Sequence, residues 1–526
     1  MLAILPRLIA ALVSGALLNL VSPPVGWHWL HWFSFLPLYW ALRPGCAKTN
    51  AKLGYAAGWI GVFMLFFWLG ETVVRFSNLP WSLSMLTVVI FATAFAIPYA
   101  IVFGPVHWLR QRLGAWWVLI VPAIQVTTEQ LSPALFPYYH GVGQYQAPWV
   151  WQLASVTGVM GISYLVFLTN AALAEAMYRR QEGRAQPWKL HIAVVLVFVA
   201  NLGFGAWRHA AVEADIAQAR SVDVALIQQN KTMEVRMDES IWESIDSWVS
   251  RTKKVVPETP DLVIWPEGSV HVNPDMTKRR FRRLGNRSPK KFFETLSKEG
   301  DFHLLVGGGT RGRKRLPDGG EVITAYNSAY SFTRDGHLGQ RYDKMVPLPF
   351  GEYIPFADTF PQLREWIKGP GNFRAGEEAT VFEAKDGDGK PYTYSVPICY
   401  EAILLGQMRK MSDVDVFVNI TNDAWFGDTA SPHQHAMLAA AMSTQFGRSM
   451  VRVAYSGISF VVDPHGDIRA AQGPFTEAAV VAPLTLHTIE TVYRRGGWLF
   501  PWLCILASIG AVLIARRREV DTGVEE

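Results

Sequence analysis

Three residues of this sequence could together carry out nucleophilic catalysis, because of where they stand relative to apolar, strand-like runs. Glu267 follows the run 261–265, Cys399 follows the run 392–398, and Lys344 precedes an apolar segment rich in Pro and Gly. A thiol at a strand-to-helix turn can be presented outward, where helix N-terminal amides lower its pKa and stabilise an oxyanion. A neighbouring lysine would also favour the thiolate, and a neighbouring carboxylate could act as the general base.

Each of these residues has an ordinary structural explanation when it is taken alone. Cys399 is the only cysteine in the long polar stretch, so no disulfide framework can form there, and a single such cysteine is more often buried and inert than reactive. Glu267 could equally be a helix N-cap, and Lys344 and Glu352 could be ordinary charges on a surface loop. The segment 345–356 is strongly apolar, however, which favours a lid or an arm that touches lipid.

Three short motifs resemble a known catalytic triad in their order along the chain. Pro-Glu267, Asp-Lys344 and Ile-Cys399-Tyr-Glu are similar to the Glu–Lys–Cys triad of the nitrilase superfamily. Segments 346–355 and 421–435 closely resemble the apolipoprotein N-acyltransferase family, the membrane-embedded branch of that superfamily, whose members carry apolar helices before and after the catalytic domain. The resemblance covers essentially the whole chain, and it implies an αββα-sandwich domain attached to an α-helical transmembrane bundle.

The resemblance implies a two-step, ping-pong acyl transfer that requires no metal and no organic cofactor. Glu267 takes the thiol proton of Cys399, and the thiolate attacks an acyl ester of a phospholipid, for which the family's usual donor is phosphatidylethanolamine. Lys344 and a backbone N–H near Tyr400 stabilise the oxyanion, and a thioester remains on the cysteine. The α-amino group of the diacylglyceryl-modified N-terminal cysteine of an apolipoprotein then attacks this thioester, which yields an amide.

The same resemblance assigns supporting roles to three further residues. Glu352 is expected to orient Lys344, and Glu401 is expected to support the site from behind. Tyr400 is expected to help to position the acyl group or the lid. Glu401 has an alternative explanation as an early-helix carboxylate with a purely structural role.

Weaker candidates for substrate contact are Met237, Glu71 and Arg75. Met237 stands where the family commonly has a Trp, and Gln229 stands where it has a Gly. This departure, with another at 452–457, leaves room for a paralogue that acts on a different acceptor. Glu71 and Arg75 lie near the outer end of an apolar stretch, where they are either candidates for headgroup contact or simply interfacial charges.

Apolar stretches that approach the width of a bilayer surround the polar part of the sequence. A helix needs about 20 apolar residues to cross a membrane. Seven candidate spans precede residue 210 and one follows the polar part, and the spans after the first favour a retained helix there over a signal peptide. They cover roughly residues 2–21, 29–42, 53–69, 83–103, 115–131, 150–177, 190–207 and 498–515.

The basic residues between these stretches indicate an orientation. Lys and Arg follow the second, fourth, sixth and eighth stretches, whereas the loops 22–28 and 132–148 contain none. The positive-inside rule therefore predicts cytoplasmic termini and an extracytoplasmic segment 210–495, which is periplasmic in the inner membrane of a Gram-negative cell. We expect a helical domain at 1–209, a catalytic domain at 210–495, and a C-terminal helix with a cytoplasmic tail at 496–526.

The polar segment has the pattern of an α/β domain. Strand-like runs, some of them ending in polar residues, alternate with helical patterns, which suggests a layered fold of sheets and helices. The clearest runs are 222–227, 261–265, 303–306, 392–398, 414–420 and 450–462, with helical patterns at 238–254 and 432–446.

Composition favours a membrane protein over a nucleic-acid-binding one. Hydrophobic residues make up 50% of the chain and charged residues 18%, and the 21 Trp suit a membrane interface. The net charge of +5 is modest, and the basic clusters flank apolar segments. His433 and His435 are two residues apart and would lie on different faces of a helix, which argues against a metal site.

Three hypotheses about function follow. The leading one is an acyltransferase that uses two membrane-anchored substrates. A membrane-tethered, nitrilase-type amidohydrolase is the first alternative, but a small soluble substrate needs neither a helical platform nor an apolar arm. A scaffold with a degenerate catalytic domain is the second alternative, and retention of Glu267, Lys344 and Cys399 argues against it.

Overall fold

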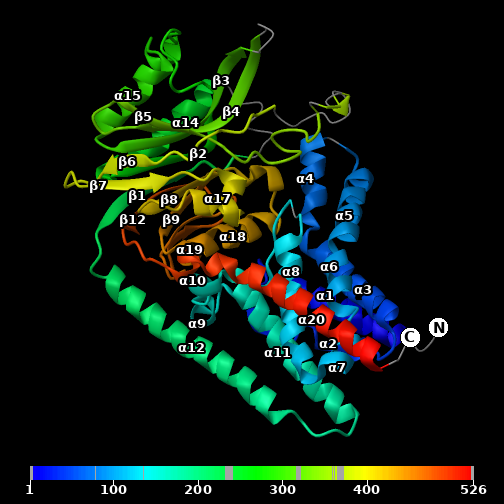
Figure 1. Cartoon of the computed structure of the whole chain (residues 1–526). Coiled ribbons are helices and arrows are strands. Elements are labelled where there is room, and N and C mark those ends of the chain that lie inside the picture. Colours follow the sequence, from blue (N-terminus) through cyan, green and yellow to red (C-terminus); the bar gives the residue numbers. More distant parts are fainter. Residues whose placement is uncertain are drawn as a thin grey trace. The chain divides into compact units, whose positions relative to one another are not determined.

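The computed structural model describes residues 4–77, 79–133, 135–231, 241–315, 321–357, 359–360, 362–363 and 372–522 (Figure 1). The chain forms two compact units. A helical unit comprises Met1–Glu71, Pro80–Ala211 and Glu490–Glu526, and an α/β unit comprises Thr72–Leu79 and Val212–Ile489.

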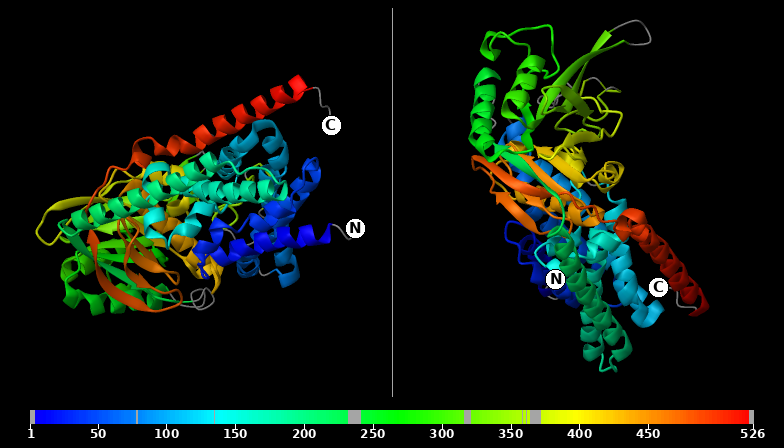
Figure 2. Two further views of the ribbon diagram at one scale, coloured as in Figure 1. Left: turned by 90° about the horizontal axis from the view of Figure 1, so that it is seen from below. Right: turned by 90° about the vertical axis from the view of Figure 1, so that its left-hand side faces the viewer.

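The helical unit consists of helices that differ widely in length, and the long, uninterrupted ones include α11, α12 and α20 (Figure 2). Two of its helices, α4 and α12, continue into the α/β unit. The α-helices are α1 (Leu5–Val21), α2 (Leu36–Ala41), α3 (Ala47–Leu65), α4 (Trp68–Ser77), α5 (Trp81–Phe95), α6 (Ile97–Phe103), α7 (Val106–Leu113), α8 (Trp117–Leu131), α9 (Pro148–Trp151), α10 (Ala154–Thr157), α11 (Val159–Gln181), α12 (Trp188–Ile216), α19 (Val492–Arg495) and α20 (Phe500–Thr522).

Helices α1 and α3 pack closely because small residues line their contact. A Cβ added to Gly15 of α1 would lie 2.1 Å from the carbonyl oxygen of Ala57 on α3, so only glycine fits there. Close backbone approach at small residues is a common way to pack helices in a membrane, where the lipid supplies no hydrophobic drive between them.

Four helical runs of the described residues are long and apolar enough to cross a membrane. They are Trp81–Leu131, Val159–Gln181, Trp188–Ile216 and Gly497–Glu519. A fifth results if Ala47–Leu65 and Trp68–Ser77, which meet at a bend of 52°, form one broken span. The prediction of about eight spans is therefore not met by the helices themselves.

The number of predicted spans differs from the number of suitable helices because an average hydropathy does not detect a break in a helix. The predicted span 29–42 contains a five-residue 3₁₀ helix and the six-residue α2, both too short to cross a bilayer. Conversely, the run Trp81–Leu131 contains two of the predicted spans. As one straight helix it would be roughly 75 Å long, more than twice the hydrocarbon thickness. Because α6 contacts α8, the chain turns back within this run.

The α/β unit contains two six-stranded sheets. The first has the order β12-β1-β2-β3-β4-β5 and the second has the order β11-β10-β9-β8-β7-β6. The strands are β1 (Ser221–Gln228), β2 (Leu262–Val270), β3 (His303–Arg315), β4 (Glu321–Phe332), β5 (Leu338–Asp343), β6 (Phe382–Lys385), β7 (Pro391–Ser395), β8 (Val416–Thr421), β9 (Ser449–Ala454), β10 (Ser459–Val462), β11 (Ile468–Gln472) and β12 (Ala478–Thr485).

The two sheets face each other through their central strands and carry helices on their outer sides (Figure 1). Strands β1 and β2 contact β8 and β9, which makes the inner layer. Helices α14 (Ile241–Val255) and α15 (Pro289–Gly300) pack on the first sheet, and α18 (Ser431–Phe446) packs on the second. This layering is the αββα sandwich that the sequence predicted. Because both faces of a central strand are covered, every residue of β8 is buried, which explains its continuous apolar run.

The strand that carries Glu267 extends further than its sequence suggests. The pattern predicted that Pro266 ends the strand, but β2 continues to Val270. Its pairing with β3 shifts register between Trp265 and Val270, and Gly268 has a φ of 63° in the left-handed region. This irregularity accommodates the proline and turns the Glu267 side chain toward the cavity described below.

Candidate active site

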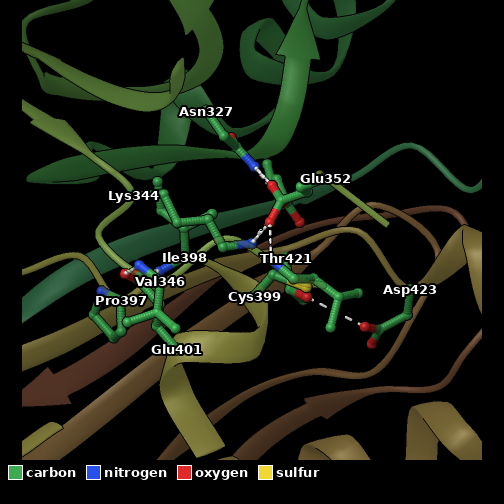
Figure 3. A network of polar contacts seen from close by, with 12 residues as sticks. Asn327, Lys344, Val346, Glu352, Pro397, Ile398, Cys399, Glu401, Thr421 and Asp423 are labelled. Carbon is green, nitrogen blue, oxygen red and sulfur yellow. Dashed lines mark hydrogen bonds and ion pairs between the residues drawn. The ribbon is translucent and has the colours of Figure 1, made fainter. Parts of the chain in front are cut away.

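The three predicted catalytic residues line one cavity of about 1070 Å³ within the α/β unit. Glu267 comes from β2. Lys344 follows directly after β5, and Cys399 opens the 3₁₀ helix η6 (Cys399–Ile403) after β7 (Figure 3). All three are nearly inaccessible to solvent. The fold therefore brings together three residues that are far apart in the sequence.

A half-buried asparagine joins the two acidic residues at this site. The amide nitrogen Nδ2 of Asn327 donates to Oε1 of Glu352 at 2.6 Å (Figure 3). It also donates to Oε1 of Glu267 at 2.6 Å. The ammonium of Lys344 lies 2.7 Å from Oε2 of Glu352 and 3.7 Å from Oε1 of Glu267. Glu352 also accepts the N–H of Leu348 at 2.6 Å. Glu352 thus forms an ion pair with Lys344, and Asn327 donates to both carboxylates.

Burial and charge set the protonation of the triad in this cavity. Burial alone would lower the pKa of Lys344, but Glu352 and Glu267 outweigh it, so the pKa is raised and the amine stays charged. Burial raises the pKa of Glu267, Glu352 raises it further, and Lys344 opposes both. The thiol of Cys399 also lowers the pKa of Glu267, so this carboxyl is close enough to the thiol to be the candidate acceptor of its proton.

The thiol of Cys399 departs from the expectation that helix amides and Lys344 would favour a thiolate. Burial raises its pKa, and the negative charge of Glu267 raises it further, while Lys344 only partly opposes the two. The 3₁₀ helix that it opens has only five residues, so few amides are aligned there. Cys399 therefore rests as a neutral thiol, and its proton must be removed as it attacks.

Alkylation kinetics test this protonation state. We expect a Cys46→Ser/Cys504→Ser variant, in which Cys399 is the only thiol, to react slowly with iodoacetamide at pH 7. Because the thiol pKa is raised, the rate should still be climbing at pH 9, beyond the point where a cysteine of ordinary pKa, about 8.5, begins to level off. Mass spectrometry of the labelled peptide between pH 6 and 10 measures the rate. A plateau below pH 8 would show a preformed thiolate and contradict the assignment.

The backbone at Cys399 is held in an unusual conformation. Its φ of 52° lies in the left-handed region. This conformation is strained for a residue with a Cβ, and such backbone strain is common at functional sites. Glu401 supports one side of this turn, because its carboxylate accepts the N–H of Ile398 at 2.9 Å. Its other oxygen accepts the N–H of Met345 at 2.8 Å and that of Val346 at 3.0 Å.

Glu401 therefore ties the nucleophile turn to the loop that carries Lys344. Tyr342 adds a fourth hydrogen bond, donating from its hydroxyl at 2.7 Å. Burial raises the pKa of Glu401 to about 7, while Lys344 and these donors oppose the rise. The side chain is fully buried and does not line the cavity, so its contacts are those of a positioning residue.

A buried ionic network supports the other side of the Cys399 turn. Nε2 of His435 lies 3.3 Å from the carbonyl oxygen of Cys399, and its Nδ1 lies 2.9 Å from Oδ1 of Asp423. Arg452 donates to Asp423 at 2.8 Å and to Asn419, its neighbour across the β8–β9 pair, at 2.6 Å. Burial alone would raise the pKa of Asp423, but Arg452 and His435 outweigh it and lower it to about 2.

Sequence reasoning missed several of these residues. Asp423 and His435 lie in the segment 421–435 that carried the family resemblance, so that segment was the available signal for them. Asn327 lies inside β4, where one polar residue on a strand gives no distinctive pattern. Arg452 lies in the fully buried strand β9, and a charged residue in such a strand requires a buried partner, which is the signal that identifies it.

The two departures from the family pattern contact each other. Gln229 is buried, and its side-chain oxygen accepts the hydroxyl of Tyr455 at 2.6 Å. Tyr455 belongs to the second departing segment, 452–457. The two departing segments are therefore in contact in the core beside β1 and β9. Met237, the other departure in the first loop, lies outside the described residues.

Aromatic side chains form much of the cavity wall. They are Phe76, Trp242, Phe281, Phe373, Trp425 and Phe426. The ring of Phe76, from the end of α4, is stacked on Trp425 at a centroid distance of 4.4 Å. Such a wall suits an aliphatic chain better than a small polar amide.

The other predicted site residues, Arg75, Glu71 and Tyr400, do not line the cavity in the described chain. Arg75 lies beside Gly427, where a Cβ would meet its Nε at 3.0 Å, so it belongs to the α/β unit close to the Phe76–Trp425 pair. Glu71 belongs to the helical unit. Tyr400 is buried next to Cys399, and the cavity-lining residues of the described chain do not include it.

Comparison with known proteins agrees with this architecture. The family model described as "Carbon-nitrogen hydrolase" matches residues 223–494, which contain almost all of the two facing sheets, so this part of the chain is a carbon–nitrogen hydrolase-type domain. A second model, "Apolipoprotein N-acyltransferase N-terminal domain", matches residues 14–172. The chain belongs to the apolipoprotein N-acyltransferase family.

Relatives of that name align over nearly the full length of the chain. The apolipoprotein N-acyltransferase of Allorhizobium ampelinum is 30% identical over 540 residues, covering 97% of this chain and 96% of the relative. That of Geobacter metallireducens is 27% identical over 521 residues, covering 97% and 95%. Among solved structures, Saccharomyces cerevisiae Nit3, of the nitrilase superfamily, is 17% identical with a TM-score of 0.37 and covers 53% of this chain and 93% of its own.

Proposed function

We propose that this chain transfers a fatty acyl group from a phospholipid to the α-amino group of the N-terminal diacylglyceryl-cysteine of apolipoproteins. The observation that carries the proposal is the joint location of Glu267, Lys344 and Cys399 in a large cavity with an aromatic wall. The names of the relatives support lipoprotein N-acylation as the reaction. No cofactor is required for this chemistry, because the thiol, the base and the electrostatic groups are side chains.

The first step forms a thioester. Glu267 accepts the proton of the Cys399 thiol, and Sγ attacks the carbonyl carbon of the donor ester. Lys344 stabilises the negative charge that develops on the carbonyl oxygen, because its ammonium is fixed by Glu352 before the reaction begins. When the tetrahedral intermediate collapses, the C–O bond breaks, and Glu267 returns its proton to the leaving alkoxide of the lysophospholipid.

The second step moves the acyl group to nitrogen. The neutral α-amine of the apolipoprotein attacks the thioester carbonyl, and Glu267 removes a proton from the attacking nitrogen. The C–S bond then breaks, the amide leaves, and the thiolate of Cys399 recovers a proton from Glu267. Closure of this cycle requires that Glu267 is ionised at the start of each step, which Lys344 favours.

We also propose that the helical unit lies in the bacterial inner membrane and that the α/β unit faces the periplasm. The apolar helices and the positions of Lys and Arg between the predicted spans support this orientation. Alkaline phosphatase, which is active only outside the cytoplasm, should be active when it is fused after Ile489 and inactive when it is fused after Glu526. The reverse result would exclude the orientation.

The fate of the thioester distinguishes acyl transfer from hydrolysis. Purified enzyme incubated with acyl-labelled phospholipid should acquire a covalent label that hydroxylamine releases. Addition of a synthetic diacylglyceryl-cysteine lipopeptide should then discharge the label into an N-acylated lipopeptide. A lipopeptide whose α-amine is acetylated beforehand is the matched control and should leave the label on the enzyme. If free fatty acid were the only product in both cases, the chain would be a hydrolase.

A further inference from the structure

A strongly cationic segment borders the cavity that contains Cys399. Residues 278–291 include eight Lys and Arg and no Asp or Glu. The side chains of Lys278, Arg279, Arg280, Arg282 and Arg287 are exposed. Within the part of the chain that the structure describes, these five cations have no carboxylate partner. The nearest preceding acid, Asp275, faces Arg341 at 3.6 Å.

The segment is ordered although its charges are exposed. The N–H of Phe281 donates to the carbonyl of Arg287 at 3.1 Å, and the N–H of Asn286 donates to the carbonyl of Phe281 at 3.0 Å, which closes a tight loop. Leu284 is buried in the core of the first sheet and anchors this loop. The guanidinium of Arg279 lies over the ring of Phe281 at 5.0 Å, so its direction is set before any ligand arrives.

The loop is part of the cavity wall. Met276, Arg279 and Phe281 line the same cavity as Cys399 and Lys344. Arg311, an exposed residue of β3, lines it as well. The cavity thus combines an aromatic lining, a nucleophile and exposed guanidinium groups that no carboxylate neutralises in the described chain.

A phospholipid fits this distribution of chemistry. When its ester carbonyl reaches Cys399, its acyl chain can occupy the aromatic part of the cavity, and its phosphodiester must lie a few bonds away. Arginine is well suited to phosphate, because its planar guanidinium offers several donors to the phosphate oxygens. A headgroup with a net negative charge is attracted by every nearby cation, whereas the ammonium of a zwitterionic headgroup is repelled by the same cations.

We propose that the cationic loop 278–287 binds the phosphodiester headgroup of the acyl donor and makes the enzyme favour net anionic donors, such as phosphatidylglycerol, over zwitterionic phosphatidylethanolamine. This inference rests on the proposed function, since it assumes that the donor is a phospholipid. It assigns to Arg279 a contact with the headgroup phosphate and to the neighbouring cations a long-range attraction.

The ratio of acylation rates from two donors tests the inference. The full chain in uncharged detergent micelles is given phosphatidylglycerol or phosphatidylethanolamine with identical acyl chains, below saturation, and thioester formation on Cys399 is timed. We expect phosphatidylglycerol to react about three- to tenfold faster, which corresponds to two or three exposed ion pairs of ordinary strength. An Arg279→Gln/Arg280→Gln/Arg282→Gln variant should bring the ratio close to one, and added salt should reduce it in the unmutated enzyme.

The matched control removes the same charge elsewhere. A Lys253→Gln/Lys254→Gln/Lys298→Gln variant loses three exposed cations that do not line the cavity, and its ratio should remain that of the unmutated enzyme. A further arm keeps phosphatidylethanolamine as the donor and adds an anionic lipid with non-hydrolysable ether-linked chains. Acceleration in that arm, equal to the gain with phosphatidylglycerol, would show that the loop binds the bulk lipid surface and would overturn the headgroup assignment.

The outcomes separate this inference from the proposed function. A thioester that forms from both donors at equal rates, with no change in the triple arginine variant, would refute only the headgroup preference. Failure to form a thioester from any phospholipid would instead refute the proposed function.

Discussion

Replacing Cys399 with alanine is expected to abolish both the covalent acyl label and the formation of N-acylated lipopeptide. Neither of the other two thiols, Cys46 and Cys504, is among the residues that line the cavity in the described chain. The loss should be at least about 10⁴-fold in the rate of acyl transfer, as expected when a covalent nucleophile is removed. Transfer of radiolabelled acyl chains to the lipopeptide measures this rate.

The matched control is Cys46→Ala, which makes the same chemical change at an exposed cysteine of the helical unit. It should acquire the label at the rate of the unmutated enzyme. Thermal unfolding checks the fold of each variant. The Cys399→Ala protein should remain folded, because the contacts that join Glu267, Asn327, Glu352 and Lys344 do not involve the thiol. A Cys399→Ala protein that still becomes labelled would show that another residue is the nucleophile.

Replacing Glu267 with glutamine is expected to slow acyl transfer by about 10²- to 10⁴-fold, the usual contribution of a general base. Glutamine keeps the shape of the side chain and can accept a hydrogen bond from Asn327, but it cannot take a proton from the thiol. Both steps should slow, because each requires a proton transfer at the same carboxylate. Rapid-quench measurement of thioester formation and of its discharge separates the two rates.

The same variant should shift the titration of the thiol in the opposite direction. Glu267 raises the pKa of Cys399 and Lys344 lowers it, so neutralising Glu267 leaves the effect of Lys344 less opposed and should lower that pKa. The pH at which the thiolate absorbance at about 240 nm reaches half its maximum reports the change. A fall in transfer together with a lower thiol pKa identifies a general base. A fall with an unchanged or higher thiol pKa would point to a merely structural role.

The α/β fold was predictable because its signals are local. Apolar runs that end in polar residues correspond to β1, β2, β3 and β8, and the two-sheet sandwich follows once the family resemblance is recognised. The spans were less predictable, because a window of apolar residues does not register a break in the backbone. The run 29–42 is apolar but lacks one continuous helix. The spans predicted at 83–103 and 115–131 fall in one helical run, Trp81–Leu131, which turns back on itself.

Some residues of the site could be predicted from local motifs, and others could be identified only from the fold. The order of Glu267, Lys344 and Cys399 could be read from short motifs. Asn327 could not, because its importance comes from lying between two carboxylates that only the fold brings together. The link between Gln229 and Tyr455 is a second example, since each looks like an isolated departure until the structure places them in contact.

The sequence by itself determined which chemical groups are present, in what order they occur, and which apolar runs they follow. It could not determine the protonation of those groups. The sequence led us to expect that helix amides and Lys344 would lower the pKa of Cys399, but the tertiary structure buries the thiol beside Glu267 and raises that pKa. The physical reason is that loss of water around a group depends on every element packed against it, here strands from both sheets and the loops between them. A motif specifies the nucleophile, the base and the cation, and the fold decides which of them holds the proton.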